Sequence, residues 1–374
     1  MKTVDSAPQV LVLGAGLIGL ACARELARRG LRVDVVDAAA SGAASPASAG
    51  LLAPVTEGAD RVALARICAD AARAWPEWAV RLEEETGLGI DFETCGSLTP
   101  VLDPAHQAHV DGLRATAELL GEPFETVSGA TLRREVPELS PAVDSALLLP
   151  TEARVDPRAV LAALERSLAA RSVPVHRPRA IHRVHPVRQG VRVEGTGWAT
   201  TVPSVVVATG SWTARIEGLQ DLPVRPVKGQ MVAYGALPWS WRGTLRSPSC
   251  YTLFRSDGRL LVGATEENAG FDVSTSEAAR VELTAAAQRY FPSLGLCEVI
   301  EQWAGLRPAS GDGLPILGYR AGTEILLAAG HHRNGVLLAP WTAARVADAV
   351  LGAAAPPAPL SPERFFEGGA TALR

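Results

Sequence analysis

The chain has 374 residues, more than one hydrophobic core usually serves, so two domains are expected. A hydrophobic fraction of 47% and a charged fraction of 20% are typical of a folded globular protein and exclude a disordered one. The net charge of −4, without any basic run, argues against nucleic acid as a partner.

The N-terminal stretch and the cysteines narrow the class further. Residues 1–9 are polar, so they predict no signal peptide, and the apolar stretch 11–23 is too short to span a bilayer. The five cysteines are scattered without a CxxC pair, which indicates reduced thiols and not a disulfide framework or a zinc site. We therefore expect a cytoplasmic protein with no membrane partner and no metal.

The chain opens with a predicted strand–helix–strand unit. Residues 10–13 form an apolar run that reads as a buried parallel strand, and residues 17–29 carry apolar residues at helical spacing. Residues 31–37 then alternate toward a second strand, which ends at Asp37. The turn between the first strand and the helix fits GxGxxG with the residues Gly14, Ala15, Gly16, Leu17, Ile18 and Gly19.

This placement predicts a dinucleotide site. Gly14 permits the tight turn, Gly16 lets the backbone approach a pyrophosphate, and Gly19 allows close packing of the helix. The helix N-terminus offers free N–H groups at Leu17 and Ile18, and Asp37 is placed to accept hydrogen bonds from a ribose. A glycine-rich turn without a ligand is the alternative, and the motif alone does not separate NAD from FAD.

Two further segments resemble the strands of this unit. Residues 201–208 and 324–329 are apolar runs that stop at Gly210 and Gly330, so three strand ends could meet at one ligand in a doubly wound sheet. Residues 83–146 read as helical stretches and residues 221–310 mainly as strands. We predict an α/β fold in which an α+β substrate domain (83–146 and 221–310), built on a mostly antiparallel sheet, is inserted into a Rossmann-type domain (8–82, 147–220 and 311–365).

Several segments together resemble the D-amino-acid oxidase superfamily of flavoproteins, and most closely its bacterial glycine oxidases of thiazole biosynthesis. The low-bulk loop 41–54 follows the second strand, and GHHRNG (330–335) comes after DGLP (312–315) in the same order as in that family. The other matching segments are VVVATGSW (205–212), 226–230, 250–251, 263–265 and WAGLRP (303–308).

The resemblance implies a non-covalent FAD. No cysteine follows Cys297, so the C-terminal half offers no thiol near the flavin end for covalent attachment as in the related sarcosine oxidases. It also implies a homo-oligomer and O2 as the electron acceptor in the family's reaction. The residues expected to hold FAD are Gly14, Gly16, Leu17, Ile18, Gly19, Asp37, Ala47, Ser48, Ala49, Gly50, Leu51, Leu52, Ala180, Ala208, Gly210, Trp212, Arg307, Gly330, His331, Arg333, Asn334, Gly335 and Val336.

By the same resemblance, the reaction moves a hydride from the α-carbon of a small, glycine-like amino acid to flavin N5. The imine formed would hydrolyse to glyoxylate and ammonia or feed thiazole synthesis for thiamin, and O2 would be reduced to hydrogen peroxide. Such chemistry needs a carboxylate clamp, for which Arg307 is the candidate, with Tyr251 and Arg333 beside it. Without the resemblance, Arg307 reads equally as part of a structural ion pair and Tyr251 as a core aromatic.

The sequence departs from glycine oxidases at two pocket positions. Glu266 stands where those enzymes carry methionine, and Ser249 where they carry histidine. A carboxylate there could hold a substrate ammonium or a basic side chain, although Glu266 and Glu267 could equally face solvent. The alternatives are therefore an oxidase or dehydrogenase acting on sarcosine, a D-amino acid or a basic amine, and a non-catalytic nucleotide-binding protein.

Overall fold

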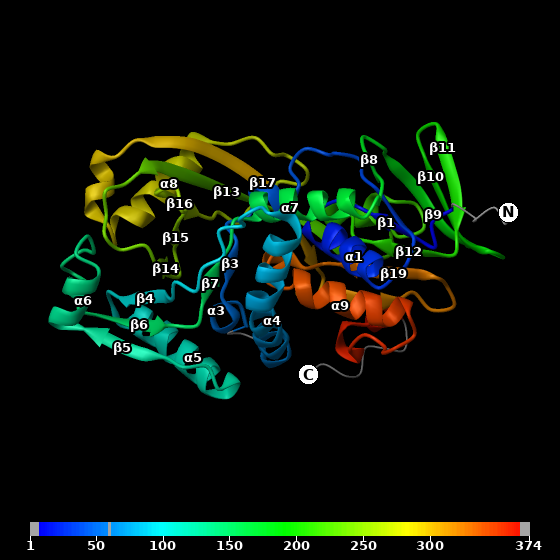
Figure 1. Ribbon diagram of the computed structural model, residues 1–374. Coiled ribbons are helices and arrows are strands. Elements are labelled where there is room, and N and C mark those ends of the chain that lie inside the picture. Colours follow the sequence, from blue (N-terminus) through cyan, green and yellow to red (C-terminus); the bar gives the residue numbers. More distant parts are fainter. Residues whose placement is uncertain (1–6, 59–60, 367–374) are drawn as a thin grey trace.

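The computed structural model describes residues 7–58 and 61–366, so residues 1–6 of the polar N-terminal stretch lie outside it. The first motif directly follows one strand of a six-stranded sheet (Figure 1). Its strands run parallel except β18, an edge strand antiparallel to β19. In sheet order they are β18 (Ile316–Tyr319), β19 (Ile325–Ala329), β12 (Ser204–Val207), β1 (Val10–Leu13), β2 (Val33–Val36) and β8 (Val175–His176).

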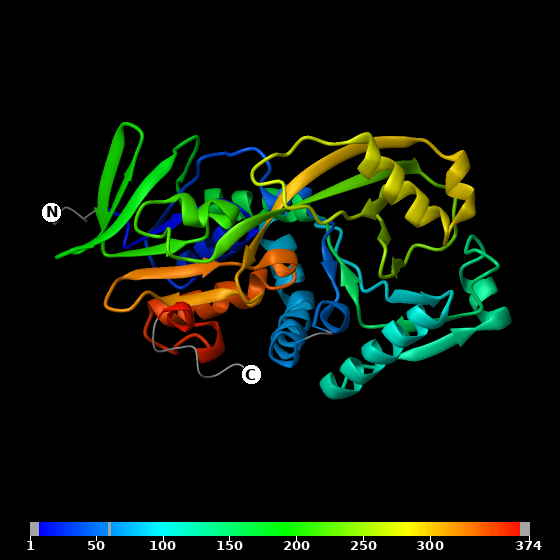
Figure 2. The same cartoon turned by 180° about the vertical axis from the view of Figure 1, so that it is seen from behind.

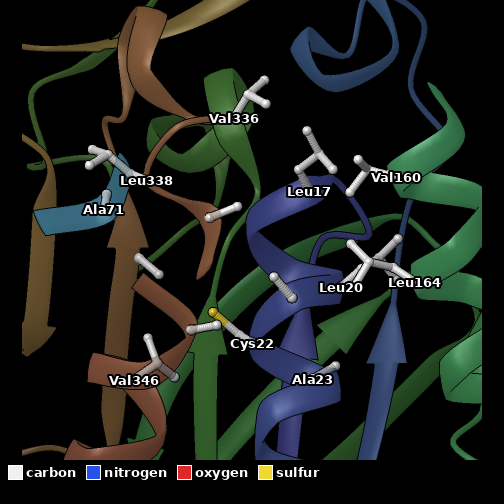
Figure 3. Packing of buried hydrophobic residues seen from close by; sticks show 14 of the residues in the cluster. Leu17, Leu20, Cys22, Ala23, Ala71, Val160, Leu164, Val336, Leu338 and Val346 are labelled. Carbon is white, nitrogen blue, oxygen red and sulfur yellow. The ribbon is translucent and has the colours of Figure 1, made fainter. Parts of the chain in front are cut away.

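Successive side chains of a strand point to opposite faces of the sheet. Helices cover one of these faces. Val10 and Val12 of β1 are buried in one cluster with the apolar stripes of α1 (Leu17–Arg28), α4 (Val62–Thr86), α7 (Pro157–Ala170) and α9 (Ala339–Val350). Figure 3 shows the packing of α1, where Leu20 faces Leu164 of α7 and Cys22 points to the other side. This packing fixes the N-terminus of α1 at the carboxyl edge of the sheet.

A small antiparallel sheet covers the opposite face. It consists of β9 (Ile181–Val187), β10 (Gly190–Gly195) and β11 (Trp198–Val202). Leu11 and Leu13, the alternate residues of β1, are buried with Val184 and Val193 of this sheet. The central strands are therefore buried on both faces, as their continuous apolar sequences predict.

The second large sheet has eight strands, and all its neighbouring strands are antiparallel except β14 and β4. The helices α5 (Pro104–Leu120), α6 (Gly129–Glu135) and α8 (Glu277–Gln288) pack against it. In sheet order the strands are β17 (Val299–Ser310), β13 (Val224–Ala236), β16 (Arg259–Gly263), β15 (Tyr251–Phe254), β14 (Thr244–Arg246), β4 (Ser97–Val101), β6 (Ser145–Leu149) and β5 (Glu125–Ser128).

The paired strands β13 and β17 connect the two large sheets. Their register runs from Val224 opposite Ser310 to Tyr234 opposite Val299, and both views show this long ribbon reaching from one half of the molecule to the other (Figures 1 and 2). Between the halves lie α2 (Ala44–Ala47), β3 (Leu51–Leu52), α3 (Pro54–Gly58) and β7 (Ala153–Arg154).

The structure confirms the predicted α/β fold, including the mostly antiparallel second sheet. One detail differs: the segment 201–208 is not one strand, because Pro203 separates β11 from β12 and places them in different sheets. The division into two domains stays a prediction, and β6 crosses the expected boundary after residue 146. Among the described residues, no helix is both long and apolar enough to cross a membrane.

Candidate functional site

A cavity of about 820 Å³ lies at the carboxyl edge of the six-stranded sheet. Four adjacent strands end on it: β2 at Asp37, β1 at Gly14, β12 at Ala208 and β19 at Gly330. The segment 43–51 forms another wall, and residues of β13, β15, β16 and β17 line the far end. The cavity is therefore an elongated space between the two large sheets, as expected at such a strand edge.

The first turn is packed so tightly that only glycine fits. Gly14 has φ +102°, and a Cβ there would lie 2.3 Å from the carbonyl oxygen of Ala208 on the neighbouring strand. A Cβ on Gly19 would lie within 1.9 Å of the Gly14 carbonyl oxygen, so this glycine sets the approach of α1 to the turn. Gly14 and Gly19 thus have the packing roles that the sequence predicts for them.

Three side chains, from the ends of β2 and β8 and from α2, hold the turn in place. Oδ2 of Asp37 accepts the Ala15 N–H at 2.7 Å. Arg177 donates to the Ala15 carbonyl oxygen at 3.1 Å, and its Nε lies 3.6 Å from Oδ1 of Asp37. At the start of α1, the Leu17 N–H donates to Oγ of Ser45 at 2.9 Å. A carboxylate next to a helix N-terminus fits the ribose and pyrophosphate of a dinucleotide.

The wall segment 43–51 is fixed by two side chains from the second sheet. Trp303 Nε1 donates to the Ala47 carbonyl oxygen at 2.9 Å, and Arg255 donates to the Ala49 carbonyl oxygen at 2.7 Å. Small residues on both sides allow this segment to pack closely against β17. A Cβ on Gly305 of β17 would come within 2.4 Å of the Ala47 Cβ. The segment therefore lies closely against the strand that carries Arg307.

Arg307 lies at the far end of the cavity without a carboxylate partner among the described residues. Its Nη1 donates to the carbonyl oxygens of Thr265 at 3.0 Å and Lys228 at 3.4 Å. Two carbonyls orient the guanidinium but do not neutralise it, so its charge remains available for an anion.

Tyr251 lies beside Arg307 on the cavity wall, in space left by a glycine. A Cβ on Gly263 of the adjacent strand would lie 2.5 Å from its hydroxyl oxygen. Its hydroxyl donates to the sulfur of Met231 at 3.6 Å. Burial raises the pKa of Tyr251, which the nearby arginines, Arg307 first, only partly oppose. The side chain is thus a neutral hydroxyl donor.

One carboxylate holds two further arginines of this wall. Glu57 of α3 accepts from Nη2 of Arg246 at 2.7 Å, and its Oε2 lies 3.2 Å from Nε of Arg333. Burial raises the pKa of Glu57, but the charges of Arg246 and Arg333 outweigh this and lower it. Glu57 is therefore ionised, and it lines the cavity together with both arginines.

The two adjacent histidines are held neutral. Burial lowers the pKa of His331 to about 4, and its Nε2 lies 3.1 Å from Oγ1 of Thr342. Burial, followed by the charge of Arg307, also lowers the pKa of His332 to about 4. The described residues contain no group of three or more His, Cys, Asp or Glu that could hold a metal ion.

Glu266 and Glu267 have different surroundings. Glu267 accepts from Gln230 at 2.9 Å and lies 3.7 Å from the Lys228 ammonium, so it belongs to a polar cluster behind the wall. Glu266 lines the cavity, is exposed, and has no hydrogen-bond or ion-pair partner among the described residues. Ser249 also lines the cavity, and its hydroxyl lies 3.2 Å from that of Ser247.

The cavity brings together most residues that the sequence predicts for the site. Tyr251, Glu266, Ser249 and most of the expected FAD-binding residues line it, including Ala180 and Trp212. Three expected FAD-binding residues do not lie on the cavity wall: Gly19, Leu52 and Asn334. Leu52 and Asn334 are buried behind it, and Gly19 packs α1 against the turn.

Sequence reasoning missed several residues of the wall. Ser45 lies inside the hydroxyl-rich segment 41–54, and no pattern in the sequence distinguishes it from the other serines there. His332 also lines the cavity, although the sequence predicts no role for it. Glu57, Arg177 and Arg246 have no sequence signal, since their role depends on partners more than 100 residues away.

The comparisons with known proteins agree with this geometry. The family described as "DAO: FAD dependent oxidoreductase" matches residues 9–349. A glycine oxidase of Pseudomonas aeruginosa is 34% identical over 357 residues, covering 92% of this chain and 95% of that protein. The crystal structure of a glycine oxidase from Geobacillus kaustophilus superposes with a TM-score of 0.89 at 30% identity, covering 95% of this chain and 98% of that one.

A longer relative matches as well. The bifunctional protein ThiO/ThiG of Synechocystis is 33% identical over 385 residues, which is 97% of this chain but 55% of that protein. The chain thus spans about half the length of such bifunctional relatives.

Proposed function

Because the chain belongs to the DAO family of FAD-dependent oxidoreductases and is an enzyme of the glycine oxidase type, we propose that it oxidises a small, glycine-like amino acid at its α-carbon. The products are the imine, which water hydrolyses to the oxo acid and ammonia, and the two-electron reduced cofactor. We further propose that O2 reoxidises the cofactor and is reduced to hydrogen peroxide.

The residues at the strand edge fit the cofactor. Asp37 would bind the ribose of FAD, and the N-terminus of α1 would bind its pyrophosphate. The walls 43–51 and 330–336 would contact the rest of the cofactor as far as the flavin ring. Bound FAD supplies the hydride acceptor, a chemistry that no side chain of the cavity can supply.

The side chains of the far end bind and orient the substrate. Arg307 grips the α-carboxylate through its free N–H groups, and the neutral Tyr251 hydroxyl donates to the same carboxylate. Holding the carboxylate at two points limits the positions that the α-carbon can take. No side-chain base is required when the amine binds in its neutral form.

The observation that carries this proposal is the unpaired Arg307 in the cavity wall. The purified yellow protein should bleach when glycine is added without oxygen, and Arg307→Ala should lower kcat/KM by about tenfold or more. A flavin that stays oxidised with glycine would exclude glycine as the substrate. A variant within about twofold of the wild type would show that Arg307 is not the clamp.

A second candidate is the same oxidation of another amine: sarcosine, a D-amino acid or a basic amine. The exposed, unpaired Glu266 favours it, because a carboxylate in the cavity attracts a substrate cation. Anaerobic flavin reduction by a panel of these amines, with Glu266→Gln as the comparison, separates the candidates. If the wild type and Glu266→Gln show the same relative rates across the panel, Glu266 does not select the substrate.

The context of the reaction is also proposed. The ThiO/ThiG relatives suggest that the imine serves thiazole synthesis. We also propose that the protein is a cytoplasmic homo-oligomer. A coupled assay for peroxide, and size-exclusion chromatography with light scattering, test the acceptor and the oligomeric state. A monomer, or a flavin that O2 does not reoxidise, would contradict these points.

A further inference from the structure

Glu57 has an unusual place in the substrate end of the cavity. It lies on α3, directly after the wall segment 43–51, and only 10% of its side chain is exposed. Its partners come from elsewhere in the fold: Arg246 from β14 of the eight-stranded sheet and Arg333 from the 3-10 turn after β19. One carboxylate therefore joins both large sheets at the substrate end of the cavity.

Arg333 depends on this carboxylate for its position. Its side chain is 44% exposed, and Glu57 is its sole side-chain hydrogen-bond or ion-pair partner among the described residues. The contacts use Nε and Nη2, so Nη1 makes no hydrogen bond or ion pair with any described residue. A half-exposed arginine has high rotamer freedom, so one buried acceptor decides whether it stays in the wall.

The buried Arg246 fixes the position of the Glu57 carboxylate. It is 5% exposed, its guanidinium lies 5.9 Å from the centroid of the Tyr251 ring, and Nη2 donates to the Glu57 carboxylate at 2.7 Å. An exposed ion pair costs side-chain entropy and contributes little, but a carboxylate already fixed by a buried arginine is preorganised for its second partner.

We propose that Glu57 is a positioning residue for substrate binding, which holds the guanidinium of Arg333 in the cavity wall beside the Arg307 site. This inference rests on the proposed function, because it takes the substrate to be an amino-acid carboxylate. Glu57 acts by fixing the position of Arg333. Its own negative charge would by itself repel a carboxylate.

The chain offers a matched control. Glu85 is also a carboxylate shared by two arginines, since it accepts from Nε of Arg24 at 3.0 Å and from Nε of Arg171 at 2.9 Å. One of these arginines is buried and the other half-exposed, as at Glu57, but Glu85 does not line the cavity. Glu85→Gln therefore removes the same kind of contact at a distance from the site.

The test is a titration of the FAD-loaded protein with acetate, followed through the visible flavin bands, beside steady-state kinetics with the best amine. Glu57→Gln should raise the acetate dissociation constant by about tenfold or more and raise KM more than it changes kcat. Glu57→Asp, which keeps the charge but not the reach, should do the same. Glu85→Gln should stay within about twofold of the wild type.

A double variant connects the effect to Arg333. Arg333→Gln should reproduce the loss, and Glu57→Gln with Arg333→Gln should lose no more than either single change. Tighter acetate binding in Glu57→Gln, a wild-type-like Glu57→Asp, additive losses, or no acetate response in the wild type would each overturn the proposal. Should no amine reduce the flavin, the proposed function fails while the acetate titration still decides the role of Glu57.

Discussion

The guanidinium of Arg307 lies against Gly229 of the paired strand β13. A Cβ at Gly229 would come within 2.3 Å of Nη2 and 2.4 Å of Cζ of Arg307. The glycine therefore leaves the space in which the arginine lies across the ribbon and reaches the carbonyl oxygen of Thr265. The position of the proposed clamp therefore depends on a glycine of the neighbouring strand, which itself lines the cavity.

Gly229→Ala should impair activity without unfolding the protein. The atoms that the new methyl group meets are the far end of a flexible side chain, so the guanidinium shifts while the backbone does not. We expect kcat/KM to fall by about tenfold or more and the unfolding free energy to change by about 1 kcal/mol or less. Gly235→Ala on the same strand is the control, because its Cβ would meet only Ile300 at 3.7 Å. Equal activities in the two variants would contradict the prediction.

Asp37→Ala should weaken FAD binding. The change removes the acceptor of the Ala15 N–H and the carboxylate expected to bind the ribose. We expect the FAD dissociation constant, measured by flavin fluorescence on dilution, to rise by about tenfold or more. Asp34→Ala is the matched control on the same strand, where the carboxylate pairs with His176 and does not line the cavity. A similar loss of FAD from both variants would show a general effect on β2.

The sequence was most informative where function depends on a local pattern. The glycine turn, the strand before it and Asp37 lie within 28 residues, and their spacing predicts a dinucleotide site at the strand edge where the structure packs Gly14 closely against Ala208. The fold class followed from the same periodicity, since continuous apolar runs separated by a helix are typical of a parallel sheet.

Local patterns do not show which distant side chains meet. Glu57 and Arg246 are 189 residues apart, and nothing near either residue marks it as part of the site. Pro203 illustrates the same limit at the level of strands, because the apolar run 201–208 continues through it while the chain passes from one sheet to another. The different surroundings of Glu266 and Glu267 also depend on a partner, Lys228, from another strand.

The buried His331 in the cavity wall should make the protein sensitive to mild acid. The folded-state pKa of His331 is about 4, below its ordinary value of 6.5, because burial disfavours the charged ring. Between these pH values the unfolded chain binds more protons than the folded one. The contribution of neutral His331 to the unfolding free energy is therefore fully present above pH 6.5 and decreases as the pH falls toward 4. At pH 5 the expected loss is about 1–2 kcal/mol from this residue.

Urea unfolding at pH 7.5 and pH 5 measures this effect. His331→Gln, which can still hydrogen-bond to Thr342 but does not titrate, should lose less stability between the two pH values than the wild type. Exposed His182 provides the control, since His182→Gln should retain the wild-type pH dependence. If His331→Gln shows the full wild-type decrease, the acid sensitivity comes from other groups and His331 is not held neutral by burial.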